Sequence, residues 1–367
     1  MNTKPYDVII VGAGPAGSAL ARLLGEKRSV LLLESRTMGR QGFTREKCCG
    51  GLLAPDAARQ LRAMGLALPD HVRETGQPLA VRAIDLHSCF ARRYRRPYVN
   101  LNRSAFEQWL LSLVPESVTV MDGVRCARIR KTGTGWEITA AEAGTGNART
   151  FTGDVVVGAE GASSIVRRTL DPNARERTLY LAVQDVYARY GGKEASRAEY
   201  AAFFHPLITD FYGWVIPKKD RVLLGAALPP RVGGASVSRR MDFLRSALEG
   251  AGYAFDGRVR REACLVARPD LCELFLGRDG AFCIGEAAGW ISPSSAEGFS
   301  YAFASARALA GALLLGRAAD DTLTAYRRNT FFLRANILWK NAKRPFMYVP
   351  PLRRLIMRAG ILAAPRD

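Results

Sequence analysis

The sequence predicts an α/β fold, because three apolar strand-like segments each run into a glycine-bearing turn and then into a helical pattern. These junctions lie within residues 6–24, 154–167 and 280–315. Before the third junction, residues 180–268 alternate apolar and aromatic positions, as is typical of an antiparallel sheet that covers a ligand cavity. We therefore expect a Rossmann-like nucleotide-binding domain, an inserted antiparallel-sheet substrate domain and a C-terminal helical tail.

The chain of 367 residues is long enough for one large domain or two closely joined domains. Because the junctions recur along the chain, the nucleotide-binding domain is expected to be discontinuous. We predict a nucleotide-binding domain over residues 1–75, 100–178 and 273–325, a substrate-binding domain over residues 76–99 and 179–272, and a basic helical segment over residues 326–367.

The first junction holds the motif around which the fold is predicted to form. Tyr6–Val11 has the composition of a buried parallel strand, and Gly12-x-Gly14-x-x-Gly17 opens the following helix. The first glycine permits a tight turn, the second lets the backbone approach a pyrophosphate, and the third lets helix and strand pack closely. A second apolar strand ends at Glu34, whose carboxylate suits ribose hydroxyls and disfavours a 2′-phosphate. This spacing predicts an unphosphorylated ADP moiety, as in FAD or NAD.

Composition narrows the class of protein. Hydrophobic residues make up 48% of the chain without a run of eighteen or more, so we expect a globular protein without a spanning helix. The N-terminus enters the first strand without a signal-peptide pattern, which predicts a cytoplasmic location. Seven scattered cysteines without a C-x-x-C pair, and three dispersed histidines, favour neither a disulfide framework nor a metal site.

The formal net charge of +19 predicts attraction to an anionic partner. An anionic membrane surface, a pyrophosphate-bearing substrate and an acidic redox protein all fit this charge. Nucleic acid is disfavoured, because no helix-turn-helix, zinc-finger or RNA-binding signature accompanies it. The sequence does not predict an oligomeric state.

Two adjacent cysteines followed by two glycines form a second candidate segment, Lys47-Cys48-Cys49-Gly50-Gly51. The glycines let this backbone approach a flat ligand closely. The Cys49 thiol is then either a proton donor or redox group, or a small buried residue that fills space beside the ligand. A later helix, capped by Asn102 or Ser104, begins with Arg103, which is a candidate cofactor contact.

Strand-like segments surround that helix. Residues 79–99 are predicted to form a strand pair, and its basic cluster Arg92–Arg96 is interpreted as the solvated face of a hairpin, with a docking patch as the alternative. Residues 118–121, 124–129 and 136–140 are predicted to form a β-meander before the second junction.

The segment Phe211–Pro217 alternates large rings with smaller residues. Since alternate side chains of a strand share a face, Tyr212 and Trp214 are expected to point to the same side. They either line the substrate cavity or belong to a core strand.

Taken in order, the three junctions resemble those of the class A FAD-dependent monooxygenase-like flavoproteins, and more closely those of their geranylgeranyl reductase branch. The resemblance covers about residues 5–325. Lys47-x-Cys49-Gly50-Gly51 is similar to that branch's Lys-x-Cys-Gly-Gly segment beside the flavin. Tyr212-x-Trp214-x-Ile216-Pro217 is similar to its Tyr-x-Trp-x-Phe-Pro motif at the substrate cavity.

The resemblance implies FAD as the cofactor and implies which residues lie around it. The implied cofactor contacts are Gly12, Gly14, Pro15, Ala16, Gly17, Glu34, Cys49, Gly50, Gly51, Arg103, Glu160, Gly161, Gly285, Glu286, Pro293, Gly298 and Phe299. The residues implied at the catalytic centre are Cys49, Tyr212 and Trp214.

Three positions depart from the family pattern. Glu160 and Glu286 stand where the family has aspartate, and Ala296 stands where it has a glycine near the flavin ring. The extra methylene of glutamate keeps the charge and the hydrogen-bonding capacity. FAD binding is therefore expected to survive with shifted geometry.

From Tyr326 onward, basic residues are interleaved with aromatic and aliphatic ones, and Asp367 is the only acid. Two interpretations stay open. The segment either forms amphipathic helices on an anionic membrane surface, or packs on the core with solvated basic faces. The first would add peripheral association with the inner face of the membrane to the cytoplasmic location.

These features predict a FAD-dependent oxidoreductase that reduces carbon–carbon double bonds of an isoprenoid or other hydrophobic substrate. Reduced flavin would deliver hydride, and Cys49 or an ordered water would supply the proton. One alternative is a FAD-dependent monooxygenase acting on a hydrophobic or aromatic substrate, and another is a non-enzymatic flavoprotein module. The expected electron donor is NAD(P)H or a reduced redox protein.

Overall fold

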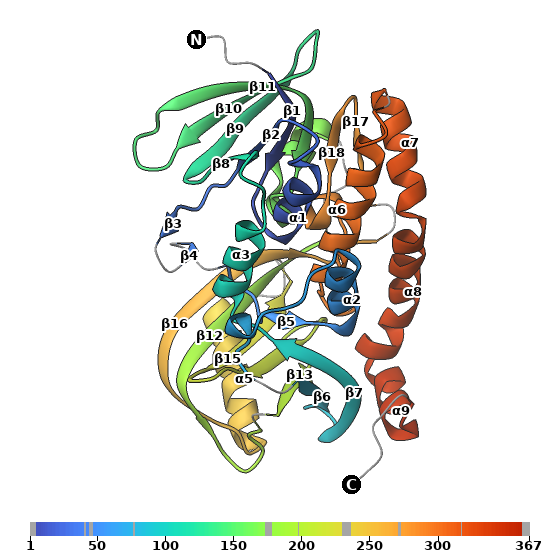
Figure 1. Cartoon of the computed structure of the whole chain (residues 1–367). Helices are drawn as coiled ribbons and strands as arrows, with labels where there is room; N and C mark the ends of the chain where they lie inside the picture. Colours follow the sequence, from blue (N-terminus) through green and yellow to red (C-terminus); the bar gives the residue numbers. More distant parts are fainter. Residues whose placement is uncertain are drawn as a thin grey trace.

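The computed structural model describes residues 5–39, 42–43, 47–75, 78–172, 178–196, 198–229, 236–270, 273–316 and 318–361. In this part of the chain, two large sheets lie at opposite ends of the molecule, and three C-terminal helices run along one side (Figure 1). This architecture confirms the predicted α/β fold with a Rossmann-like sheet, an antiparallel sheet and a helical C-terminal region. The predicted domain limits stay a prediction.

The first sheet has the strand order β17-β18-β11-β1-β2-β8, and its pairs β1–β11, β1–β2, β2–β8 and β11–β18 are parallel. The central strand β1 is buried over its last four residues, as a parallel strand covered on both faces should be. The strands are β1 Tyr6–Val11, β2 Val30–Leu33, β8 Thr119–Met121, β11 Ala148–Gly158, β17 Gly277–Arg278 and β18 Ala281–Cys283.

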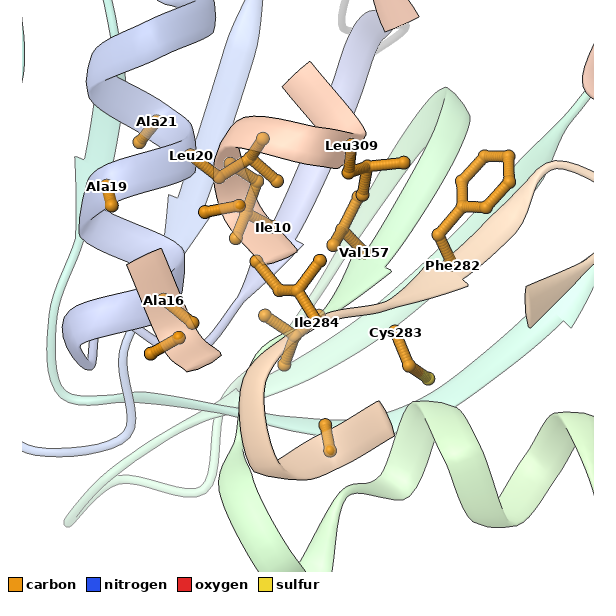
Figure 2. Packing of buried hydrophobic residues seen from close by; sticks show 14 of the residues in the cluster. Ile10, Ala16, Ala19, Leu20, Ala21, Val157, Phe282, Cys283, Ile284 and Leu309 are labelled. Carbon is orange, nitrogen blue, oxygen red and sulfur yellow. The ribbon is translucent and has the colours of Figure 1, made fainter. Parts of the chain in front are cut away.

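Two helices pack against each other and against this sheet, namely α1 (Pro15–Leu24) and α6 (Phe299–Leu313). Figure 2 shows Leu20 of α1 beside Ile10 of β1 and Leu309 of α6 beside Val157 of β11, and all four side chains are fully buried. This packing fixes the ends of the strands from which the three glycine-bearing junctions emerge.

The predicted meander is only partly correct. Strands β9 (Val124–Lys131), β10 (Trp136–Glu142) and β11 do form successive antiparallel pairs. Strand β8 does not join them, because it pairs in parallel with β2. An apolar segment of a few residues cannot specify its partner, and here the open edge of the parallel sheet takes it.

The second sheet is antiparallel except for the parallel pair β6–β13 and has the order β16-β12-β15-β14-β13-β6-β7-β5. Helix α5 (Val237–Gly250) covers one face through Met241, Leu244 and Leu248. The strands are β5 Leu52–Leu53, β6 Leu79–Asp85, β7 Phe90–Asn100, β12 Leu179–Gly191, β13 Glu199–Phe204, β14 Gly213–Pro217, β15 Val222–Leu228 and β16 Ala254–Ala267.

Strands β6 and β7 confirm the predicted strand pair. The arginines of the basic cluster point alternately to the two faces of β7. Arg93 and Arg95 are exposed, whereas Arg92 and Arg96 are half-buried. Arg92 Nε donates to the carbonyl of Met357 at 2.7 Å, so it holds the C-terminal segment. A purely solvated hairpin is therefore wrong for the inward-facing arginines.

The C-terminal segment forms α7 (Ala319–Asn329), α8 (Phe331–Tyr348) and α9 (Pro350–Ala359). It packs on the core through buried residues such as Tyr326, whose hydroxyl donates to the carbonyl of Cys283 at 3.1 Å. None of the helices described is long and apolar enough to cross a bilayer. The interpretation of helices packed on the core is confirmed for the inner face.

Shorter elements complete the described chain. Asn102, and not Ser104, caps α3, because its side chain accepts from the amide of Ala105. The remaining elements are β3 Met38–Gly39, β4 Gly42–Phe43, α2 Pro55–Ala63, α3 Arg103–Ser112 and α4 Ile165–Leu170, with 3₁₀ turns at Asp70–Val72, Gly161–Ser163 and Gly285–Ala288.

Candidate functional site

Two adjoining pockets lie where the glycine-bearing junctions meet the second sheet. The central pocket encloses about 1360 Å³ and the lateral pocket about 1250 Å³, including space open to solvent. The central pocket runs from Gly14 to Tyr212 and Trp214 at the start of β14, and the lateral pocket runs from Gly12 to Glu34. Residues that line both pockets are Gly14, Lys47, Cys48, Ala159 and Cys264. Together the pockets suit a long ligand with two different ends.

The first loop has the backbone that its glycines predict. Gly12 has a φ of +101°, which favours glycine, and a Cβ on Gly17 would lie 1.8 Å from the carbonyl oxygen of Gly12. A Cβ on Gly14 would meet nothing within 4 Å and would point into open space. Gly17 is therefore needed for packing, whereas Gly14 leaves space for a ligand at the start of α1.

Glu34 lies at the far end of the lateral pocket and is buried. Its Oε2 accepts from the amide of Ala13 at 3.0 Å, and its Oε1 accepts from Arg36 Nε at 3.0 Å. These contacts hold the carboxylate at the carboxyl end of β2. A carboxylate has further lone pairs for ribose hydroxyls, so this arrangement fits the predicted contact.

The two glutamates that replace aspartates are both held by backbone amides. Glu160 accepts from the hydroxyl of Ser164 at 2.7 Å and from the amide of Ile165 at 3.1 Å, so it caps the start of α4. Burial raises its pKa. Glu286 lines the central pocket and accepts from the amide of Ala267 at 2.8 Å. Each of the two longer side chains thus ends in a hydrogen bond from a backbone amide.

Arg103 begins α3 and lies in the wall of the central pocket beneath Phe299, 4.7 Å from its ring centre. Its guanidinium pairs with Glu107, which also accepts from Arg36 Nη1 at 2.7 Å. The Nε of Arg103 is buried and has no hydrogen-bond partner among the described residues. A buried donor without an acceptor is costly, so it indicates that a ligand completes this site.

Cys49 lies in the central pocket, where its sulfur accepts from the amide of Gly51 and from Arg103 Nη1, both at 3.5 Å. Cys48 lines both pockets, and its thiol donates to the carbonyl of Ala182 at 3.8 Å, while the thiol of Cys264 donates to the carbonyl of Cys48 at 3.1 Å. The hydrogen bond with Cys264 and burial raise the pKa of Cys48, which therefore stays protonated at neutral pH. Of the two adjacent cysteines, Cys49 is the one whose sulfur Arg103 contacts.

Tyr212 and Trp214 both line the central pocket, with ring centres 5.8 Å apart, as their alternation predicts. The hydroxyl of Tyr212 donates to the carbonyl of Ser295 at 2.8 Å. The indole of Trp214 donates to the side chain of Gln184 at 3.1 Å. Their polar atoms are thus occupied, and the rings present apolar surface to the pocket.

One polar group in this pocket has no signal in the sequence. Tyr98 of β7 donates to Glu297, which lies just before α6, and Arg96 donates to the same carboxylate at 3.0 Å. Tyr200 contacts Tyr98 edge to face at 5.2 Å. Burial raises the pKa of both tyrosines, so both stay protonated. The glycine motif of the first junction gives no indication of this group. Its members come from β7, β13 and the loop before α6, and they meet only in the folded chain.

The two pockets gather almost all of the predicted site residues. Two are not in the lining: Gly17 acts in helix packing, and Pro293 is buried with its carbonyl accepting from Arg268 at 3.2 Å. The predicted residues that line the pockets are Gly12, Gly14, Pro15, Ala16, Glu34, Cys49, Gly50, Gly51, Arg103, Glu160, Gly161, Tyr212, Trp214, Gly285, Glu286, Gly298 and Phe299. Their individual roles stay predictions.

Comparison with known proteins agrees with this geometry. A family model described as an FAD binding domain matches residues 5–202. The chain belongs to this family. Protein CbrA of Escherichia coli O6:H1, a full-length relative, is 39% identical over 363 residues, which cover 98% of this chain and 95% of CbrA.

Solved structures of other flavoproteins share the fold. A geranylgeranyl bacteriochlorophyll reductase-like protein from Thermoplasma acidophilum has a TM-score of 0.79 at 16% identity, over 96% of this chain and 90% of that protein. PqsL from Pseudomonas aeruginosa, described as a probable FAD-dependent monooxygenase, has a TM-score of 0.67 at 20% identity, over 97% and 100%. At these identities the two structures show the fold alone.

The family identifies the protein as an FAD-dependent flavoenzyme with oxidoreductase chemistry, and the residues present fit the cofactor. The open space at Gly14 suits a pyrophosphate, and Glu34 at the far end of the lateral pocket suits a ribose. Arg103, whose buried Nε has no partner among the described residues, lines the central pocket.

The ion pairs behind the pocket predict a pH dependence of stability. Burial disfavours ionisation of Glu107, but Arg103 and Arg36 lower its pKa from 4.5 to about 2. Since this pKa lies below that of the unfolded chain, the ionised carboxylate stabilises the fold above about pH 4.5, and its contribution is lost as pH falls toward 2. The contribution is on the order of 3 kcal/mol. We expect Glu107→Gln to be destabilised by about this amount at pH 5, with the difference shrinking toward pH 3.

Urea unfolding of both proteins at a series of pH values measures this difference. Glu249→Gln, which removes a carboxylate from an exposed pair with Arg245, serves as the control. Parallel stability curves for Glu107→Gln and the wild type would contradict the assignment.

Proposed function

We propose that this flavoenzyme reduces a carbon–carbon double bond of an isoprenoid or another hydrophobic molecule in the central pocket. One observation carries the proposal: the Cys49 thiol and an aromatic, aliphatic wall line the same pocket. Apolar side chains in the wall include those of Leu52, Trp214, Ile216, Val266 and Ile291. Such a wall favours an apolar substrate and excludes water from the reacting atoms.

Two motifs support the geranylgeranyl reductase branch within the family. Lys47-x-Cys49-Gly50-Gly51 and Tyr212-x-Trp214-x-Ile216 both contribute to the lining of the central pocket. Gly50 lies close to Ile216, since a Cβ on Gly50 would be 2.3 Å from Ile216 Cδ1. The two motifs therefore support each other spatially, although they are far apart in the sequence.

The residues of this chain have distinct roles in the proposed reaction. FAD, when bound and reduced, supplies the hydride that is added to one carbon of the double bond. The Cys49 Sγ holds the proton for the other carbon, and Arg103 and the amide of Gly51 fix its position. Tyr212 and Trp214 orient the substrate through their ring faces. The product gains two hydrogens, and the two electrons come from NAD(P)H or a reduced redox protein.

The test compares products made with and without oxygen. Purified holoprotein is incubated anaerobically and then aerobically with a chemical reductant and a bacterial lipid extract, and products are read by mass spectrometry. A gain of two hydrogens under anaerobic conditions is the expected result. A gain of one oxygen atom, seen only in air, would replace the proposal with the monooxygenase alternative.

Free FAD with the same reductant and extract provides the background. The incubation is repeated with NAD(P)H and with a reduced redox protein as the electron donor. If no mass change exceeds the background with any donor, the protein does not act on these lipids, and the non-enzymatic flavoprotein module is favoured.

A further inference from the structure

Helix α8 carries an apolar surface that the core does not cover. Phe332 is 83% exposed and Trp339 is 59% exposed, although rings of this size are normally packed. The other large apolar side chains exposed on this helix and directly after it are Phe331, Leu338, Phe346 and Val349. A contiguous exposed patch of this kind marks an interaction surface rather than ordinary surface variation.

The exposed and packed residues of α8 lie on opposite faces. Ile337 is buried, and half-buried Leu333 and Arg344 lie on the same side at helical spacing. The exposed residues follow a second helical row, Phe331, Ala335, Leu338, Ala342, Phe346 and Val349, with Phe332 and Trp339 beside it. Helix α8 thus has two apolar faces: one packs against the protein, and the other is exposed to solvent.

Basic residues border the exposed row on both sides. By helical periodicity Arg334 lies along one border and Lys343 along the other, with the ammonium of Lys343 4.5 Å from the centre of the Trp339 ring. Residues 326–361 contain nine lysines and arginines and no acid. Within the described chain, those without an ion pair are Arg327, Arg328, Arg334, Lys343, Arg354 and Arg358.

We propose that the outer face of α8 binds an anionic lipid bilayer, with its aromatic row in the interface and its cations at the lipid headgroups. Aromatic rings flanked by lysine and arginine are the composition that peripheral helices use at such surfaces. A second copy of this chain is the poorer occupant, because it would bring two sets of unpaired cations together.

The inner face of the same helix contacts the loop before α6, which lines the central pocket. Lys340 Nζ lies 3.8 Å from Glu297, and the hydroxyl of Tyr348 donates to the carbonyl of Ser294 at 2.5 Å. The proposed bilayer surface is therefore about one helix diameter, roughly 10 Å, from a loop that lines the pocket. A hydrophobic substrate in the pocket fits this placement, but the bilayer proposal rests on the outer face alone.

The test uses co-sedimentation of the holoprotein with vesicles of phosphatidylcholine, alone or with about 30% phosphatidylglycerol as the anionic lipid. Binding is expected only to the anionic vesicles and is expected to fall with added salt. The double variant Phe332→Ser/Trp339→Ser should lose roughly tenfold or more of its partitioning. The double variant Arg334→Gln/Lys343→Gln should lose roughly fivefold per charge at low salt.

Matched controls place the same changes elsewhere. Leu207→Ser/Val259→Ser removes two side chains that are 71% and 60% exposed on the second sheet and its loops, and Lys27→Gln/Arg239→Gln removes two exposed cations. Both controls should bind like the wild type. Equal loss in the controls, or no binding to anionic vesicles, would overturn the proposal.

A second copy would give a different result. A dimer in light scattering that Phe332→Ser/Trp339→Ser converts to monomer, without vesicle binding by either form, would also overturn the proposal. None of these measurements needs turnover, so failure here is distinct from failure of the proposed reaction.

Discussion

Gly14→Ala is expected to weaken FAD binding by at least about tenfold while leaving the stability of the apoprotein unchanged. The backbone of Gly14 has φ −69° and ψ −176°, which alanine adopts readily, and the new methyl would meet no protein atom within 4 Å. It would occupy the space that the pyrophosphate is expected to use. FAD titration of the apoprotein measures the first effect, and thermal unfolding without FAD measures the second.

Gly17→Ala is the matched variant with the opposite expectation for stability. Its methyl would lie 1.8 Å from the carbonyl oxygen of Gly12, so α1 must move away from β1. Such overpacking costs about 2–3 kcal/mol, so both apoprotein stability and FAD binding should fall. If Gly14→Ala also destabilised the apoprotein, or left FAD affinity intact, the assignment of its open space to the pyrophosphate would be wrong.

Cys49→Ala is expected to lower the rate of double-bond reduction by roughly 10²- to 10⁴-fold, which is the usual contribution of a positioned proton donor. FAD content and its absorbance spectrum should not change, since the thiol fills little volume and the Arg103–Glu107 pair remains. Single-turnover reoxidation of the reduced enzyme by substrate, under anaerobic conditions, measures this rate directly.

Two further variants sharpen this result. Cys49→Ser keeps a hydrogen at the same place and should retain part of the rate, whereas Cys89→Ala changes an exposed cysteine at the end of the β6–β7 turn and should have no effect. Unchanged turnover in Cys49→Ala would remove this thiol from the mechanism and leave an ordered water as the proton source.

Local sequence patterns were sufficient to predict the structure of the glycine-bearing junctions. The left-handed φ of Gly12 belongs to the turn itself, and Gly17 is required by the carbonyl of Gly12 only five residues away, so their spacing predicts the strand, the turn and the helix together. The same is true of Asn102, which caps α3 through an amide three residues away. Patterns of this kind predict each loop by itself because the interactions that shape the loop are local.

The other half of the site depends on contacts between distant segments. Tyr98 and Glu297 are 199 residues apart and meet only because β7 and the start of α6 converge on the central pocket. The displaced strand β8 has the same explanation, because the edge of the parallel sheet selects it as a partner. Such pairings carry no local signal, and only tertiary packing decides them.

The backbone beneath Trp214 has a consequence for selectivity. Gly225 of β15 lies directly opposite Trp214, and a Cβ there would be 2.4 Å from the indole ring. The missing side chain lets the indole settle against the neighbouring strand. Any larger residue at position 225 would push the ring toward the ligand and shorten the pocket. A position outside the pocket lining thus sets where the indole of Trp214 lies, and we expect substitutions at Gly225 to change the space left for a ligand.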